Sequence, residues 1–253
     1  GFAVVEDEEK KVIVKNTVPE QKVRFAVNKI RKGQAEGRLL EILEHSPEEC
    51  QPACPHFGVC GGCTYQNLPY EKQVEMKEAQ IHAMMDAAVD GDYIWEGVKE
   101  SPVREAYRNK MEFSFGDEYK DGPLALGMHK RGSFHDIVNV TECKIVDEDF
   151  RRIIKAVLEF ATDTGLPYYH RMRHTGFFRH LLVRKAVRTG EILIDLVTTS
   201  EAQLDEARLV EKLTGLSYDG KLAGILHTTN NSLADVVKDE GTKILYGQDY
   251  FYE

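Results

Sequence analysis

Three of the five cysteines have a spacing that could hold a metal. Cys54, Cys60 and Cys63 lie in the sequence Cys-Pro-His-Phe-Gly-Val-Cys-Gly-Gly-Cys, with Cys50 just before them and Cys143 far downstream. Two thiolates separated by two residues can reach one centre from a tight turn, and intervening glycines let the backbone wrap closely around it. An odd number of cysteines cannot all pair and no secretion signal opens the chain, so a disulfide framework is the weaker interpretation.

A distant cysteine can complete such a centre. Three thiolates from the loop together with Cys143 give four ligands, and four thiolates suit either a structural zinc or an iron–sulfur cluster. The spacing does not decide between these two, and buried thiols without a metal are the remaining alternative. We expect a metal or cluster centre, with Cys50 as a spectator.

A second chemical signal is the run of basic and aromatic residues at 168–190, which contains six Lys and Arg residues and no Asp or Glu. Arginines bind phosphates and aromatic rings stack on unpaired bases, which is what recognition of single-stranded RNA requires. The alternative is a hairpin with one solvated basic face. The arginines that we expect at an RNA interface are Arg171, Arg173, Arg179 and Arg184.

Two shorter basic groups precede this run. They lie around a predicted strand at 108–115 and at the end of another predicted strand at 124–129. In the first strand the charged residues alternate with Met111, Phe113 and Phe115, so a charged sheet face is expected with or without RNA. The further candidates for RNA contact are Arg108, Lys110, His129, Lys130 and Arg131.

The elements that position these residues divide the chain into three parts. Residues 1–45 alternate like half-buried strands and predict a small β module with a basic run at 22–38. Residues 46–93 form the cysteine-rich loop and a helix from Pro69 to about Ala88. In residues 94–253 the strands come in neighbouring groups and do not alternate strictly with helices. This order predicts an α+β domain with a largely antiparallel sheet.

The cysteine motif and its neighbours resemble a known family. The carrying features are Cys-x5-Cys-Gly-Gly-Cys-x-x-Gln at 54–66, then Tyr70, Gln73 and Lys77, and Cys-x-Ile-x-Asp at 143–147. They resemble the RNA uracil-C5 methyltransferases of the RumA type, which modify 23S rRNA. Further similarity lies in Ala35-Glu36-Gly37-Arg38, Tyr107-Arg108-Asn109-Lys110 and Leu126-Gly127-Met128-His129-Lys130-Arg131.

The resemblance implies a fold, two cofactors and a partner. It implies a TRAM-type, barrel-like module at the start and a 4Fe–4S cluster held by Cys54, Cys60, Cys63 and Cys143. It also implies a Rossmann-like domain that binds S-adenosylmethionine, and RNA as the partner, with ribosomal RNA favoured over transfer RNA.

The sequence departs from this family in one respect. No cysteine follows Cys143 and no Gly-x-Gly occurs, although the family uses a later cysteine as nucleophile and a glycine-rich cofactor loop. The chain also stops in Tyr250-Phe251-Tyr252-Glu253. We therefore expect a fragment without the Rossmann-like domain, with no catalytic residue and no activity alone. The alternatives are a stand-alone RNA-binding module and a zinc-stabilised structural adaptor.

Overall charge gives little support to RNA binding. The 253 residues carry a formal net charge of −9, so attraction to a polyanion must come from local basic groups. No apolar stretch approaches the ~18 residues of a membrane-spanning helix. We expect a cytoplasmic monomer with no membrane partner.

Overall fold

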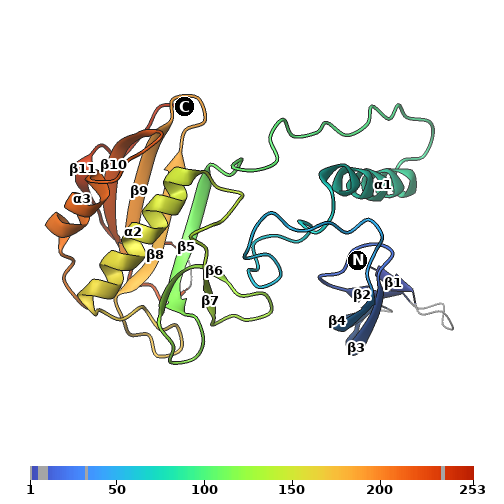
Figure 1. The fold of residues 1–253 in the computed structure, drawn as a ribbon, viewed down its shortest axis with the longest axis horizontal. Coiled ribbons are helices and arrows are strands. Elements are labelled where there is room, and N and C mark those ends of the chain that lie inside the picture. The colour runs from blue at the N-terminus through green and yellow to red at the C-terminus, as the bar shows by residue number, and fades with distance from the viewer. Residues whose placement is uncertain (1, 5–10, 32–33, 235–236) are drawn as a thin grey trace. The chain divides into compact units, whose positions relative to one another are not determined.

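Figure 1 presents the computed structural model of the chain, which describes residues 2–4, 11–31, 34–234 and 237–253. The chain divides into two compact units. The first comprises Gly1–Ala53 with Cys63–Ser101, and the second comprises Cys54–Gly62 with Pro102–Glu253. The division into three parts, at 1–45, 46–93 and 94–253, stays a prediction.

The first unit contains a four-stranded sheet in the order β1-β2-β4-β3. Its small core consists of Val12, Val14 and Ala35, against which Phe25 and Leu39 pack. The barrel-like module expected from the sequence is therefore, in the described residues, a sheet in which β2 and β4 run parallel. The predicted turn at Lys32-Gly33 lies outside the described residues. The strands are β1 (Phe2–Val4), β2 (Lys11–Val14), β3 (Lys22–Arg31) and β4 (Gln34–Glu44).

A helix follows the cysteine-rich loop in the same unit. α1 spans Tyr70–Ala88 directly after Pro69, as predicted, but none of its residues is buried. The segment after it runs back along the helix, where the Trp95 indole donates to Glu78 at 2.8 Å and the Tyr70 hydroxyl accepts from the Ser101 amide at 2.7 Å. Polar contacts thus join the helix to the segment that follows it.

The second unit contains a seven-stranded sheet in the order β11-β10-β9-β8-β5-β6-β7, with α2 and α3 on one face (Figure 1). Large fully buried side chains such as Phe113, Phe150 and Ile194 fill the space between the sheet and the helices. The elements are β5 (Lys110–Asp117), β6 (Leu124–His129), β7 (Ile137–Asn139), α2 (Glu148–Thr164), β8 (Phe178–Lys185), β9 (Glu191–Thr198), α3 (Glu206–Thr214), β10 (Lys221–Thr229) and β11 (Thr242–Gly247).

This sheet corrects the predicted fold class. β9 and β10 pair in parallel and α3 connects them, so the second unit contains a strand–helix–strand crossover. The fold is mixed α/β, where α+β was expected. The Asp205 carboxylate caps α3 by accepting from the Arg208 amide at 3.1 Å.

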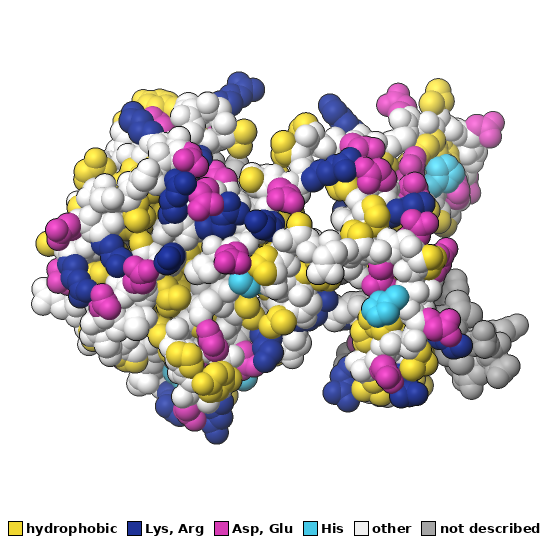
Figure 2. All heavy atoms as spheres, in the orientation of Figure 1, with side chains coloured by type: hydrophobic (Ala, Val, Ile, Leu, Met, Phe, Trp, Pro, Cys, Tyr) yellow, Lys and Arg dark blue, Asp and Glu magenta, His cyan; other side chains and the backbone are white. Residues whose placement is uncertain are grey.

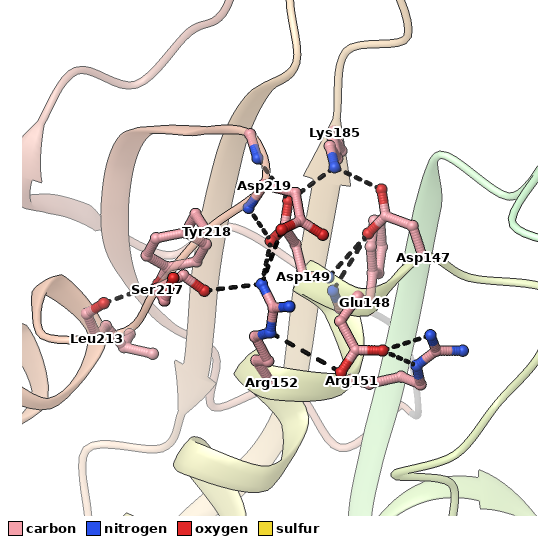
Figure 3. Close-up of polar contacts among 12 residues, drawn as sticks. Asp147, Glu148, Asp149, Arg151, Arg152, Lys185, Leu213, Ser217, Tyr218 and Asp219 are labelled. Atoms are coloured by element: carbon pink, nitrogen blue, oxygen red, sulfur yellow. Dashed lines mark hydrogen bonds and ion pairs between the residues drawn. The ribbon is translucent and has the colours of Figure 1, made fainter.

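A polar network fixes the start of α2 to the end of β8 (Figure 3). Asp147 caps the helix, as predicted, and its carboxylate and that of Asp149 accept from Lys185 Nζ at 2.5 and 2.7 Å. The Asp149 side chain is 1% exposed and also accepts from the amides of Asp219 and Gly220. Three segments distant in sequence are thereby held together by one buried carboxylate.

Within the described ranges, no helix is long and apolar enough to cross a membrane.

Candidate nucleic-acid interface

Four of the predicted RNA-binding residues come together in the second unit. Arg171 Nη2 donates to His129 Nε2 at 2.8 Å, which joins the end of β6 to the loop that precedes β8. Since Nε2 accepts this bond from a permanently charged guanidinium, the His129 ring is neutral. Lys130 and Arg131 follow directly, and Lys130 is exposed. We call His129, Lys130, Arg131 and Arg171 the His129 group.

The cysteine-rich loop packs against the His129 group. The Gly61 amide donates to the His129 carbonyl at 2.9 Å, and the Arg131 amide donates to the Val59 carbonyl at 2.7 Å. A Cβ on Gly61 would lie 2.9 Å from the His129 carbonyl oxygen, so this close approach requires glycine. The Arg131 guanidinium also lies 5.2 Å from the centre of the Phe57 ring. The loop therefore presents an aromatic ring beside the basic side chains.

A second basic group forms where β5 and β8 pair. Lys110 lies directly opposite Arg184 in the antiparallel register, and Arg108 Nε donates to the Lys110 carbonyl at 3.2 Å. Arg108 and Arg184 are exposed, while Lys110 lies 3.5 Å from the Glu112 carboxylate. The predicted charged face of this strand pair is confirmed, and we call Arg108, Lys110 and Arg184 the Arg184 group.

Arg179 has a different environment from the other arginines. It is 3% exposed, and its guanidinium donates to the carbonyls of Asn230, Ser232 and Ala234 at 2.9, 2.6 and 2.8 Å. The same group stacks on the Tyr169 ring at 4.2 Å. Arg179 therefore holds the loop after β10 in place and is not available at the surface for a phosphate.

Arg173 is exposed in the turn before β8, where its amide donates to the carbonyl of His170 at 3.1 Å.

Figure 2 shows basic and acidic side chains interspersed over the face that it draws. This mixture agrees with the negative net charge, so RNA binding would depend on the two local basic groups.

Three of the predicted cluster ligands belong to the second unit. Cys54 and Cys143 are buried and Cys60 is half-buried, while the half-buried Cys63 belongs to the first unit. The Gly62 amide donates to Cys60 Sγ at 3.4 Å. Among the residues that the structure describes, no three His, Cys, Asp or Glu side chains form a group that could hold a metal ion.

His56 ties the cysteine loop to the segment of Cys143. Its Nε2 accepts from the Glu142 amide at 3.3 Å, so the residue next to Cys143 is hydrogen-bonded to the loop. Burial lowers the pKa of His56 below its ordinary value, although the nearby Glu142 carboxylate opposes this effect. The ring is therefore neutral at pH 7 and can accept this hydrogen bond.

A hollow that sequence reasoning missed lies where the parallel strands β9 and β10 end and α3 begins. It is lined by residues that include Ser200, Glu206 and Lys243. In it, His227 Nε2 and the Thr198 hydroxyl form a hydrogen bond of 2.8 Å. Burial lowers the pKa of His227. The carboxyl ends of parallel strands are where α/β sheets bind ligands, but the participating residues are too far apart in sequence to form a motif.

Comparisons with known proteins give relatives of one kind. No family model matches the chain. A protein of Clostridium acetobutylicum named "uncharacterized RNA methyltransferase" is 50% identical over 254 residues, which cover 100% of this chain and 55% of the relative. One of the same name from Caldanaerobacter subterraneus is 41% identical, with 100% and 56% covered. The chain thus spans about half the length of the curated relatives that it matches.

A solved structure has the same fold. The tRNA (uracil-54, C5)-methyltransferase of Pyrococcus abyssi, in complex with S-adenosyl-L-homocysteine, matches with a TM-score of 0.69 and 20% identity. The match covers 95% of this chain and 52% of that one. Nearly all of this chain thus matches a cofactor-bound methyltransferase. The expectation that this chain lacks a Rossmann-like, S-adenosylmethionine-binding domain is therefore not supported and is withdrawn.

Proposed function

We propose that this chain, whose curated relatives are named RNA methyltransferases, is of the uracil-C5 type that its motifs resemble and binds RNA for methylation at carbon 5 of uracil. The methyl donor in this proposal is S-adenosylmethionine. We favour ribosomal RNA as the substrate, from the sequence resemblance, with transfer RNA as the alternative. We further propose that the protein acts as a cytoplasmic monomer.

The His129 group is the observation that carries this proposal. Arg131 lies over the Phe57 ring and Arg171 is bonded to His129, so cations and an aromatic ring are held together by specific contacts. Guanidinium and ammonium groups bind phosphates, and an adjacent aromatic ring can stack on an unpaired base. A target uracil must be unstacked before it can react, and a single-strand binding surface favours that state.

The salt dependence of RNA binding tests the role of the His129 group. A variant with Lys130→Glu, Arg131→Glu and Arg171→Glu should bind an RNA fragment more weakly. Its plot of log affinity against log salt should become less steep by roughly 2, because three phosphate contacts on a single strand are lost. Arg188→Glu, in the exposed turn between β8 and β9, is the matched control. An unchanged slope in the triple variant contradicts the proposal.

We propose separately that Cys54, Cys60, Cys63 and Cys143 bind a 4Fe–4S cluster. The spacing of the cysteines and the hydrogen bond that ties His56 to Glu142 support this set. Bound there, the cluster would link the cysteine loop to the segment of Cys143, and methyl transfer itself needs no electron from it.

Iron analysis after anaerobic purification tests the cluster. The brown protein should contain about four iron atoms per chain, and Cys60→Ser should remove both the colour and the iron. Cys50→Ser is the control, since Cys50 is exposed and stands outside the proposed set. A colourless protein with one zinc ion would contradict the cluster and favour the zinc-stabilised adaptor.

A further inference from the structure

A second pocket lies on the sheet face opposite to α2 and α3. Its floor consists of Leu182, Leu193 and Leu226, from the adjacent strands β8, β9 and β10. Neighbouring residues on these strands, such as Ile194, point to the helix-covered core, so the floor residues point the other way. The pocket has a volume of about 380 Å³, in the range of small-molecule sites. The remaining lining residues are Arg184, Asp195, Asp249, Tyr250 and Phe251.

Asp195 is a carboxylate on this apolar floor, and we call the site the Asp195 pocket. In the strand register it lies between Leu182 on one side and Leu226 on the other. Its Oδ2 accepts from the Thr228 hydroxyl at 3.0 Å, while the buried Oδ1 has no hydrogen-bond partner in the described part of the chain. A buried acceptor without a partner costs free energy, so its retention points to a ligand that supplies a donor.

The electrostatics of Asp195 agree with this interpretation. Burial raises its pKa to about 6, although the Thr228 hydroxyl bond opposes the shift. At neutral pH the carboxylate is therefore mostly ionised but poorly solvated, which makes it a strong acceptor for an N–H group. Carboxylates in such environments occur at functional sites more often than elsewhere.

A donor lies beside this acceptor. Arg184 is opposite Leu193 and Leu182 is opposite Asp195, so the guanidinium and the carboxylate are diagonal neighbours, with Cβ atoms roughly 7–8 Å apart. Arg184 is exposed and makes no ion pair among the described residues. At the rim, Tyr250 is 51% exposed and Asp249 adds a second acceptor. The pocket thus combines a flat apolar floor, an aromatic rim, one donor and one main acceptor.

We propose that the Asp195 pocket binds an unpaired nucleobase that carries a ring N–H next to a carbonyl oxygen, as uracil and guanine do. The N–H donates to Asp195 Oδ1, the carbonyl oxygen accepts from Arg184, and the ring lies on the leucine floor beside Tyr250. Adenine and cytosine have no ring N–H on their pairing edge, so they leave the carboxylate without that donor. This inference rests on the proposed RNA-binding function and does not make the bound base the target of methylation.

Titration with four mononucleotides tests the pocket in the whole chain. Methyl signals of Leu182, Leu193 and Leu226 are followed by NMR while uridine, guanosine, cytidine or adenosine 5′-monophosphate is added. Uridine and guanosine monophosphates should shift these signals with affinities about tenfold higher than the other two, since one hydrogen bond to a charged group is lost there. Equal shifts with all four, or none at about 10 mM, overturn the proposal.

Two substitutions identify the recognising groups. Asp195→Asn keeps the size of the side chain and Arg184→Gln keeps a neutral donor, and each should reduce the preference for uridine and guanosine monophosphates to less than threefold. Arg188→Gln is the matched control and should keep the full preference. An Asp195→Asn variant that folds and retains the wild-type preference contradicts the assignment.

The pocket and the RNA-binding function fail in different ways. If the pocket is wrong but the function is right, the mononucleotides do not discriminate while RNA affinity still falls when the His129 group is reversed in charge. If the function is wrong but the pocket is right, the mononucleotides discriminate while RNA affinity is unaffected by that reversal.

Discussion

At the residue scale, the buried carboxylate of Asp195 lowers the stability of the folded state when it is ionised. Asp195 has an ordinary carboxyl pKa of 3.8 when unfolded and a pKa of about 6 in the folded chain, because burial disfavours its charge. The folded state therefore holds its proton more tightly than the unfolded state. The cost of ionisation is absent below pH 3.8, grows between pH 3.8 and 6, and is fully present above pH 6.

Asp195→Asn should for this reason stabilise the protein at pH 8. A pKa difference of about two units corresponds to roughly 2–3 kcal/mol, and the gain should shrink as the pH falls from 6 toward 4. Urea unfolding at pH 8 and pH 5 measures it. Asp249→Asn, at an exposed position, should change the stability by less than about 0.5 kcal/mol at both pH values. A loss of stability in Asp195→Asn at pH 8 would refute the assigned cost.

Arg179 should behave in the opposite way. Arg179→Met removes the donors of three carbonyls while keeping much of the side-chain volume, so we expect a loss of about 2–4 kcal/mol in the free energy of unfolding. Denaturant melts of this variant and of the exposed control Arg173→Met provide the comparison. Equal stabilities for the two variants would show that the buried contacts contribute nothing.

The sequence predicted the exposed position of Arg184 but not the separate environment of Arg179. Alternation along the strand correctly assigned Leu182 and Arg184 to one face and Leu181 and Val183 to the other. Alternation alone would put Arg179 on the core face with Leu181. A bulge between Phe178 and His180 breaks this pattern, and a bulge leaves no reliable trace in a single sequence.

At the element scale, the start of α2 depends on ions from three segments. Burial opposes ionisation of Asp149, but hydrogen bonds from Lys185 and from the amides of Asp219 and Gly220 outweigh it and lower the pKa of Asp149. A lowered carboxyl pKa contributes stability that is present above the ordinary value of 3.8 and is lost as the pH falls through the folded-state pKa.

Lys185→Met should therefore destabilise the second unit by about 3 kcal/mol at pH 7, because two carboxylates lose their cation and one of them is buried. The difference from the wild type should shrink as the pH falls below 3.8 and through the folded-state pKa of Asp149. Thermal melts across this range test both statements. The control Lys221→Met, whose exposed side chain pairs with Glu191, should cost less than about 1 kcal/mol.

Helices and strands were easier to predict than their directions and partners. Pro69, the helical spacing after it and the capping Asp147 located two helices, and alternation located the β8–β9 hairpin. Strand direction is different, because a parallel and an antiparallel strand have the same side-chain period. The parallel pair β9–β10 was therefore missed, and with it the mixed α/β class. The helical spacing after Pro69 likewise did not show that α1 buries no residue.

At the scale of the whole molecule, the net charge is negative, so any attraction to RNA has to come from local groups of basic residues. The net charge of −9 repels RNA at long range, so the proposed RNA binding should depend on close contacts at the His129 and Arg184 groups. Such contacts are sensitive to salt, and raising the salt from about 50 to 200 mM should weaken RNA binding by roughly tenfold or more. Fluorescence anisotropy with a labelled RNA measures this. An affinity independent of salt would exclude phosphate contacts as the main source of binding.

The cysteine motif also predicted the family correctly. The absence of a glycine-rich motif, in contrast, led to a wrong inference about the Rossmann-like domain. The cysteine spacing and its neighbours identified RNA methyltransferases because these residues lie close together in the chain and form a compact sequence pattern. The inference that a Rossmann-like domain is absent rested on the missing glycine motif and on the missing cysteine after Cys143, and the structural match over 95% of the chain contradicts it. A pattern that is present is thus a firmer guide than one that is missing.

Mapping of 5-methyluridine in cellular RNA tests the central claim most directly. In cells whose only copy of the whole protein carries Lys130→Glu, Arg131→Glu and Arg171→Glu, we predict that at least one 5-methyluridine in ribosomal RNA is lost or strongly reduced. The Arg188→Glu control should retain it. Wild-type levels of every 5-methyluridine in both ribosomal and transfer RNA, in the triple variant and in cells without the gene, would contradict the account.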